Sequence, residues 1–217
     1  MSTIAVIGGH GKVGLLLSRS LASSGHTVRS VIRNPDQADD VASTGAEPVV
    51  ADIETSSAAE LAAAIGTADA VVFTAGNGGK GGPERTEAVD HQGALKAIEA
   101  ATRLGTDRFV VVSYLGADDP TAGGRSGMIP YQRAKQAADD ALRASDLAWT
   151  IVRPGGLNDG AADGVTIDPG ITEGTTSRAN VAELVAALVT DHPAPRQVLN
   201  VIDGPTPIVD AIEQALR

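Results

Sequence analysis

Tyr131 and Lys135 stand four residues apart in the segment Tyr131-Gln132-Arg133-Ala134-Lys135. Residues with this spacing lie on one face of a helix, with Cβ atoms about 6 Å apart. An ammonium group at that distance stabilises a phenolate and lowers the pKa of the phenol toward neutrality. The pair therefore predicts proton transfer at a carbonyl or alcohol. A surface Tyr and Lys that merely pack together are the alternative.

A glycine-rich turn lies near the start of the chain and comprises Gly8, Gly9, His10, Gly11, Lys12, Val13 and Gly14. It follows the apolar run 4–7 and precedes an apolar-periodic run over 13–21, so it joins a predicted strand to a predicted helix. Glycines spaced by three let the backbone approach a ligand, and the helix N-terminus presents free N–H groups to an anion. We expect the turn to bind a dinucleotide diphosphate, with His10 and Lys12 offsetting phosphate charge or facing water. An ordinary glycine-rich turn is the alternative.

The ends of the next strands carry the residues expected to contact the cofactor and to decide between NADP(H) and NAD(H). Arg33 follows the second predicted strand, where it offers a planar cation to a 2′-phosphate. This favours NADP(H) over NAD(H), unless Arg33 only solvates a helix start. Asp52 is expected to meet the adenine amino group, with a turn residue as an equal alternative, and Ile53 to cover the ring. Ala75 and Gly76 end the fourth strand, where small residues let the backbone lie against the diphosphate and ribose; a plain strand end is the alternative.

Strand-like and helix-like segments alternate along the chain and position these residues. Mostly continuous Val/Ile/Ala runs predict strands at 3–7, 27–32, 47–51, 69–75, 108–113, 148–153 and 197–202. Helices are predicted near 12–24, 35–43, 57–65, 84–103, 131–145, 178–190 and 207–216. The pattern predicts an α/β fold with a Rossmann-type, doubly wound parallel sheet in one domain, 1–217. Loops 76–82, 115–130 and 157–176 follow strands at the functional edge.

Composition excludes several classes of protein. Apolar residues make up 42% of the chain and aromatic residues 2%, so the core must be built from Ala, Val, Leu and Ile. The chain has no cysteine and four scattered histidines, which gives no disulfide and no expected metal site. A net charge of −10 argues against nucleic acid and anionic membranes as partners. We expect a cytoplasmic protein that is a monomer or small homo-oligomer and binds a small-molecule substrate.

These motifs resemble the short-chain dehydrogenase/reductase superfamily, in particular its atypical NAD(P)-binding branch near the NmrA-like and flavin/biliverdin-reductase-like proteins. The likeness rests on the glycine turn, Arg33, Asp52-Ile53, Val89-Asp90 with Gly93, the run 108–113, Tyr131 with Lys135, and Arg153-Pro154-Gly155. The resemblance implies that Lys135 holds the nicotinamide ribose and that Tyr131 is the general acid. It also implies that the backbone of Pro154, Gly155 and Gly156 lies beside the carboxamide. By the same resemblance, the loops and helices after residue 153 form a small substrate portion of the single domain.

Ser113 and Tyr114 depart from the pattern of this family. Members with complete catalytic machinery usually end the fifth strand with two small hydroxyl residues, of which the second orients the substrate oxygen. Here Tyr114 takes the second place. Because strand side chains alternate between faces, an offset of one residue can turn the hydroxyl of Ser113 away from the site. Ser113 is therefore either the third catalytic residue or a structural hydroxyl, and Tyr114 either replaces it or walls the pocket.

The leading expectation is an NADPH-dependent oxidoreductase that transfers hydride to a small carbonyl, quinone or flavin-like acceptor, with Tyr131 as general acid. A non-catalytic NAD(P)-binding redox sensor of NmrA-like type is the alternative. An isomerase or epimerase ranks last, because it needs a deeper sugar pocket than the short segment after Arg153 can form.

Overall fold

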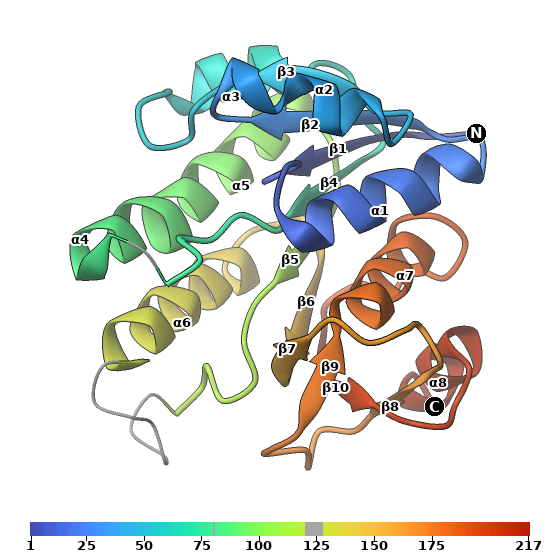
Figure 1. Cartoon of the computed structure of the whole chain (residues 1–217). Helices are drawn as coiled ribbons and strands as arrows, with labels where there is room; N and C mark the ends of the chain where they lie inside the picture. The colour runs from blue at the N-terminus through green and yellow to red at the C-terminus, as the bar shows by residue number, and fades with distance from the viewer. Residues whose placement is uncertain (80, 120–127) are drawn as a thin grey trace.

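The strands of the computed structural model form one large sheet with a fixed order (Figure 1). The structure describes residues 1–79, 81–119 and 128–217. The sheet has eight strands in the order β3-β2-β1-β4-β5-β6-β10-β8, all parallel except the β10–β8 pair. Their bounds are β1 Thr3–Ile7, β2 Thr27–Ile32, β3 Glu47–Val50, β4 Ala70–Phe73, β5 Arg108–Val112, β6 Ala148–Pro154, β8 Val165–Ile167 and β10 Gln197–Asp203.

Helices cover both faces of this sheet (Figure 1). α1 and α7 pack together on one face with α8 beside α7, and α3, α5 and α6 lie on the other. Each face has its own apolar core, built mainly from Ala, Val, Leu and Ile. The bounds are α1 Lys12–Ser23, α2 Ala38–Ala42, α3 Ala58–Ile65, α4 Gly82–Thr86, α5 Gly93–Leu104, α6 Ile129–Arg143, α7 Arg178–Val189 and α8 Ile208–Ala215. The Rossmann-type parallel sheet predicted from the sequence is thus confirmed.

The register of the central strands brings their carboxyl ends level. Ile7 pairs with Phe73, Phe73 with Val111, and Val111 with Ile151, so the four residues form one row across the sheet. The chain segments that follow this row must therefore meet at one edge. The strand order reverses between β1 and β4, where crossovers leave toward opposite faces and open a crevice.

Two regions differ from the sequence-based expectation. The predicted helix over 84–103 consists of α4, a π-helical turn η2 (Glu87–Gln92) and α5. The predicted loop 157–176 contains β8 and overlaps two further short strands, β7 (Gly156–Asn158) and β9 (Thr175–Ser177). These two strands pair with each other in a second, two-stranded sheet. Strands of three residues are too short to show a period of two in the sequence. Residues 80 and 120–127, within two of the other predicted loops, lie outside the described residues.

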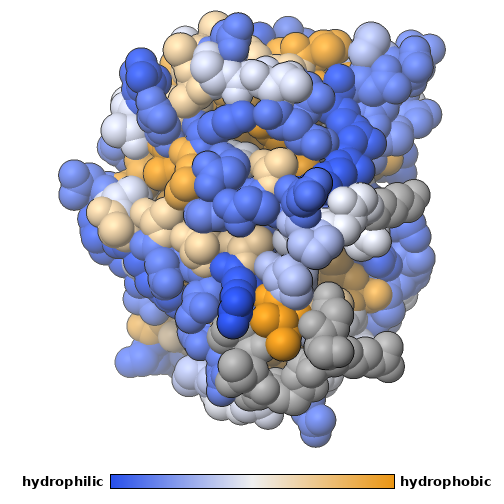
Figure 2. All heavy atoms as spheres, turned by 90° about the vertical axis from the view of Figure 1, so that its left-hand side faces the viewer, coloured by the Kyte–Doolittle hydropathy of each residue, from blue (hydrophilic) through white to orange (hydrophobic). Residues whose placement is uncertain are grey.

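The surface that carries α4 and α6 is largely hydrophilic, with apolar areas between the hydrophilic side chains (Figure 2). Large apolar side chains that are exposed elsewhere are scattered, such as Val50 and Val209. Across the described ranges, every helix is too short or too polar to reach from one side of a membrane to the other.

Candidate functional site

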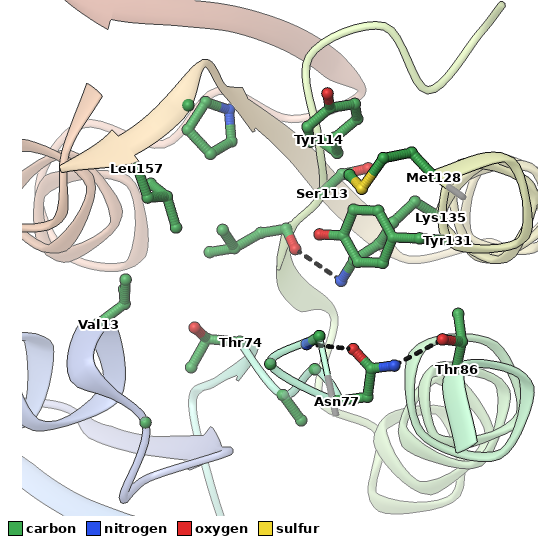
Figure 3. Close-up of a pocket in the computed structure, with 18 of the residues that line it drawn as sticks. Val13, Thr74, Asn77, Thr86, Ser113, Tyr114, Met128, Tyr131, Lys135 and Leu157 are labelled. Carbon is green, nitrogen blue, oxygen red and sulfur yellow. Dashed lines mark hydrogen bonds between the residues drawn. The ribbon is translucent and has the colours of Figure 1, made fainter. Parts of the chain in front are cut away.

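A cavity of about 730 Å³ opens at the carboxyl edge of the sheet (Figure 3). This volume lies within the range of pockets that bind small molecules and cofactors. Its walls come from segments far apart in the chain: 11–13, 74–79, 112–114 and 154–157, together with Met128, Tyr131 and Lys135 at the start of α6. The sheet register explains why these segments meet, because each one follows a strand of the central row.

The glycine turn forms one wall of the cavity and fits a phosphate group. Gly8 has φ +89°, and a Cβ there would come within 2.6 Å of the backbone nitrogen of Ala75. A Cβ on Gly14 would collide with the carbonyl oxygen of Gly8. Gly11 is the N-cap of α1 and supplies no side-chain cap, so the first amides of the helix remain available to an anion at the cavity wall.

The predicted cofactor residues divide into two groups by position. Those that line the cavity are Gly11, Lys12, Val13, Ala75, Gly76, Lys135, Pro154, Gly155 and Gly156. Gly8, Gly9 and Gly14 belong to the same turn but not to the cavity lining, and they allow close packing within the protein. A Cβ on Gly9 would stand 2.6 Å from Cβ of Ser30. His10, Arg33, Asp52 and Ile53 lie outside the cavity lining.

Tyr131 and Lys135 project from α6 toward the cavity (Figure 3). The ammonium nitrogen of Lys135 lies 5.8 Å from the centroid of the Tyr131 ring. The same nitrogen lies 3.3 Å from the carbonyl oxygen of Val112 and 3.3 Å from Oδ1 of Asp90, which is fully buried. The predicted pair is therefore brought together at the cavity, but its cation is also held by a carboxylate.

The protonation of Tyr131 differs from the sequence-based expectation. Burial raises the pKa of Tyr131 above its usual value, and the attraction of Lys135 only partly opposes this. Asp90, Tyr114 and Asp139 raise the pKa further, because their negative forms disfavour a phenolate. The expected lowering toward neutrality is therefore wrong for this site: the phenol keeps its proton, as a general acid requires.

Ser113 and Tyr114 both line the cavity beside Tyr131 (Figure 3). The Tyr114 and Tyr131 rings meet edge to face, with centroids 5.5 Å apart. Ser113 is buried, and its Oγ makes no hydrogen bond of ordinary geometry with the described residues. Burial raises the pKa of Asp139, and Ser113 is one of the neighbours that act to lower it, so the hydroxyl faces this carboxylate.

The side chains at the end of β2 and β3 form a small charged group outside the cavity. Arg33 is half exposed, and its guanidinium lies 3.5 Å from Glu54, which also accepts a 3.0 Å bond from Arg85. Asp52 accepts a hydrogen bond from the backbone nitrogen of Glu54 at 3.0 Å, so it acts as a turn residue. Ile53 is buried and approaches Gly93 of α5.

His10 and Lys12, the polar residues of the glycine turn, each contact a carboxylate from a distant segment. His10 contacts Asp40 at 2.8 Å, and Lys12 contacts Asp159 at 2.9 Å. Asp159 also accepts a 2.6 Å bond from Arg178, the first residue of α7. Lys12 and Arg178 both line the cavity, so two cations converge on one carboxylate at its rim.

Sequence reasoning missed Asn77, Arg178 and the role of Asp90. Asn77 and Arg178 line the cavity but belong to no motif with a fixed spacing. Asp90 appeared only as part of a family likeness. Asp90 is followed at helical spacing by the small residues Gly93, Ala94 and Ala97, which predict close packing of this face. An acid at that position was a usable signal, because a buried carboxylate needs a partner.

A family model described as NAD(P)H-binding matches residues 8–192. The chain belongs to this NAD(P)H-binding family. The matched range includes the glycine turn, Tyr131, Lys135 and the segment after β6. It confirms the NAD(P)-binding superfamily that the sequence motifs resemble, and the cofactor is therefore a nicotinamide dinucleotide. The family includes oxidoreductase-like and epimerase-like proteins.

Individual relatives of this NAD(P)H-binding protein extend over nearly the whole chain. A Bacillus subtilis protein named "Uncharacterized sugar epimerase YhfK" is 37% identical over 213 residues, which cover 97% of this chain and 99% of that protein. The structure of a "Putative NAD-dependent epimerase/dehydratase" from Bacillus halodurans is similar with a TM-score of 0.92 and 36% identity, covering 99% and 100% of the two chains. An anaerobillin reductase from Escherichia coli O157:H7 has a TM-score of 0.75 and 26% identity, covering 92% and 96%.

Proposed function

We propose that this protein is an NADPH-dependent reductase of a small carbonyl, quinone or flavin-like acceptor. A bound nicotinamide supplies the hydride for such a reaction. The observation that carries the proposal is one cavity with the glycine turn and the free amides of α1 on one wall and the protonated phenol of Tyr131 on another. We further propose a monomer or small homo-oligomer that acts in the cytoplasm on a small molecule.

We assign a role to each residue that lines the cavity and to Arg33, which lies outside the lining. The amides at the start of α1 and Lys12 bind the diphosphate, and Arg33 binds the 2′-phosphate. Lys135 donates to the nicotinamide ribose, and the backbone of Pro154, Gly155 and Gly156 lies against the carboxamide. Tyr131 donates its proton to the acceptor oxygen, and Ser113 and Tyr114 shape the wall beside it.

The names of two relatives make an epimerase the second candidate. An epimerase that works through transient oxidation needs a base to remove a proton from an alcohol first. Burial raises the pKa of Tyr131, so near neutral pH the phenol carries its proton and the phenolate that would act as a base is scarce. The free site therefore holds Tyr131 in the protonation state with which a reduction begins, and this supports the reductase over the epimerase.

The proposed function is tested by turnover. We expect purified protein with NADPH to reduce at least one member of a panel of quinones, flavins and small carbonyl compounds, followed by the loss of reduced-cofactor absorbance. Thermal shift with NADPH and with NADH reports cofactor binding in parallel, because a ligand that binds the folded chain raises Tm. Binding without turnover across the panel would favour a redox sensor. Conversion of a sugar nucleotide without net cofactor consumption would favour an epimerase.

The NADPH preference is tested at Arg33. Replacing it by Ala should weaken NADPH binding by about 10- to 100-fold, since hydrogen bonds to a charged phosphate contribute roughly 1.5 to 3 kcal/mol. NADH binding should change by less than about two-fold, because NADH lacks the 2′-phosphate. Isothermal titration of both cofactors measures the difference. Arg85→Ala is the matched control, because Arg85 shares the Glu54 partner but lies on α4. Equal losses for both cofactors in Arg33→Ala would contradict the phosphate role.

A further inference from the structure

Asp90 is a fully buried carboxylate in the π-helical turn η2, between α4 and α5. π-turns inside helices occur frequently at functional sites, because the extra residue re-aims a side chain. η2 packs against α6, and this contact brings Asp90 to Lys135. A carboxylate in such a place requires a charged or hydrogen-bonding partner.

The two carboxylate oxygens of Asp90 contact different parts of the site. Oδ2 accepts a hydrogen bond from the backbone nitrogen of Asn77 at 3.1 Å. Oδ1 makes no hydrogen bond of ordinary geometry with the described residues and faces the Lys135 ammonium at 3.3 Å. The Asn77 side chain in turn donates to Thr86 at 2.5 Å and accepts from the nitrogen of Gly79 at 2.8 Å (Figure 3). Asp90 thereby joins the loop after β4 to the lysine of α6.

This arrangement changes the field that the phenol feels. A lone ammonium beside Tyr131 would favour the phenolate. Here the ammonium and a carboxylate form a close pair, and the field of such a pair falls off faster with distance than that of a single charge. The other ionisable groups that act on Tyr131 are Asp139 on α6 and Tyr114 after β5. Lys12 and Arg178 line the same cavity and are paired with Asp159.

We propose that Asp90 is a positioning residue that keeps Tyr131 a protonated donor, by pairing with Lys135 and cancelling part of its positive field at the phenol. The inference rests on the proposed function and deepens it, because it names the residue that keeps Tyr131 in the protonated form that its role as proton donor requires. It concerns the free protein, so it can fail independently of whether any acceptor is reduced.

The chain is well suited to a direct test, because it contains only two tyrosines. Tyr114→Phe leaves Tyr131 as the single tyrosine, whose ionisation is followed by the ultraviolet absorbance of tyrosinate. In this background, Asp90→Asn should lower the pH midpoint of tyrosinate formation by about one unit or more. Asp90→Glu should keep the midpoint near that of the background protein. The comparison uses the pH range over which native circular dichroism is retained.

Thr86→Val is the matched control, because it removes the Asn77–Thr86 hydrogen bond and leaves every charge in place. Its midpoint should not move. The proposal is overturned if Asp90→Asn leaves the midpoint unchanged, as it would if Lys135 lost its proton in place of Tyr131. It is also overturned if Thr86→Val produces an equal shift. Should Asp90→Asn not fold, Asp90→Ser asks the same question. Loss of folding in both, with Asp90→Glu folded, would assign Asp90 a purely structural role.

Discussion

Tyr131→Phe should lower turnover with a carbonyl acceptor by about 10²- to 10⁴-fold, the usual contribution of a positioned general acid. The substitution removes one hydroxyl and keeps the ring, which packs edge to face on Tyr114 and lies beside the Lys135 ammonium. Cofactor affinity should therefore change by less than about two-fold. Steady-state kinetics on an acceptor found in the panel, with isothermal titration of NADPH, measures both quantities.

Tyr114→Phe supplies the matched control for this prediction. Its ring lies 5.5 Å from that of Tyr131 and lines the same cavity, so the two variants differ only in which hydroxyl is lost. We expect Tyr114→Phe to keep most of the activity. A flavin-like acceptor that needs only hydride should be reduced almost as well by Tyr131→Phe as by the wild type. Full activity of Tyr131→Phe on carbonyl acceptors would remove Tyr131 from the chemistry.

Arg153→Leu should lower the free energy of unfolding by about 3 to 5 kcal/mol, the range for breaking a buried ion pair. Arg153 is 3% exposed and lies directly beneath the cavity edge, at the end of β6. Its guanidinium donates to Oδ2 of Asp139 at 2.7 and 3.0 Å, and to both oxygens of Asp118. Asp139 is fully buried, so the substitution leaves a carboxylate without its cation. Urea unfolding followed by circular dichroism measures the loss.

Two comparisons identify the cause of this loss. Arg143→Leu also removes an arginine that contacts Asp118, at 3.3 Å, but Arg143 is partly exposed and should contribute less than about 1 kcal/mol. Adding Asp139→Asn to Arg153→Leu should restore much of the stability, because the unpaired charge is gone. No recovery in the double variant would show that packing, and not charge, explains the loss.

The stability of Arg153→Leu should also depend on pH in a defined direction. Burial already raises the pKa of Asp139 in the folded protein, and Arg153 opposes this rise. Without Arg153 the folded pKa moves further above the unfolded value of about 3.9. A carboxyl with a raised folded pKa costs stability as pH increases above its unfolded pKa, since the unfolded state then binds fewer protons. The deficit relative to wild type should therefore shrink as pH falls toward that value. A deficit that grows in acid would contradict the assignment.

Local pattern in the sequence was enough to predict the main elements and the position of the chemistry. Continuous apolar runs located the seven longer strands to within two residues or so, because a buried parallel strand needs apolar side chains on both faces. The glycine turn and the Tyr131–Lys135 spacing are also local signals. Each follows from backbone geometry within a few residues, and the structure brings both to one cavity.

Tertiary structure alone decided the electrostatics of the site. The expected lowering of the Tyr131 pKa failed because burial and the Asp90 carboxylate outweigh the attraction of Lys135. Lys12 meets Asp159 across 147 positions of the chain, and Asp139 meets Arg153 between a helix and the next strand. No periodicity records such pairs, because a charge senses whatever the fold brings within a few ångströms, and the dielectric around it depends on how deeply the finished structure buries it.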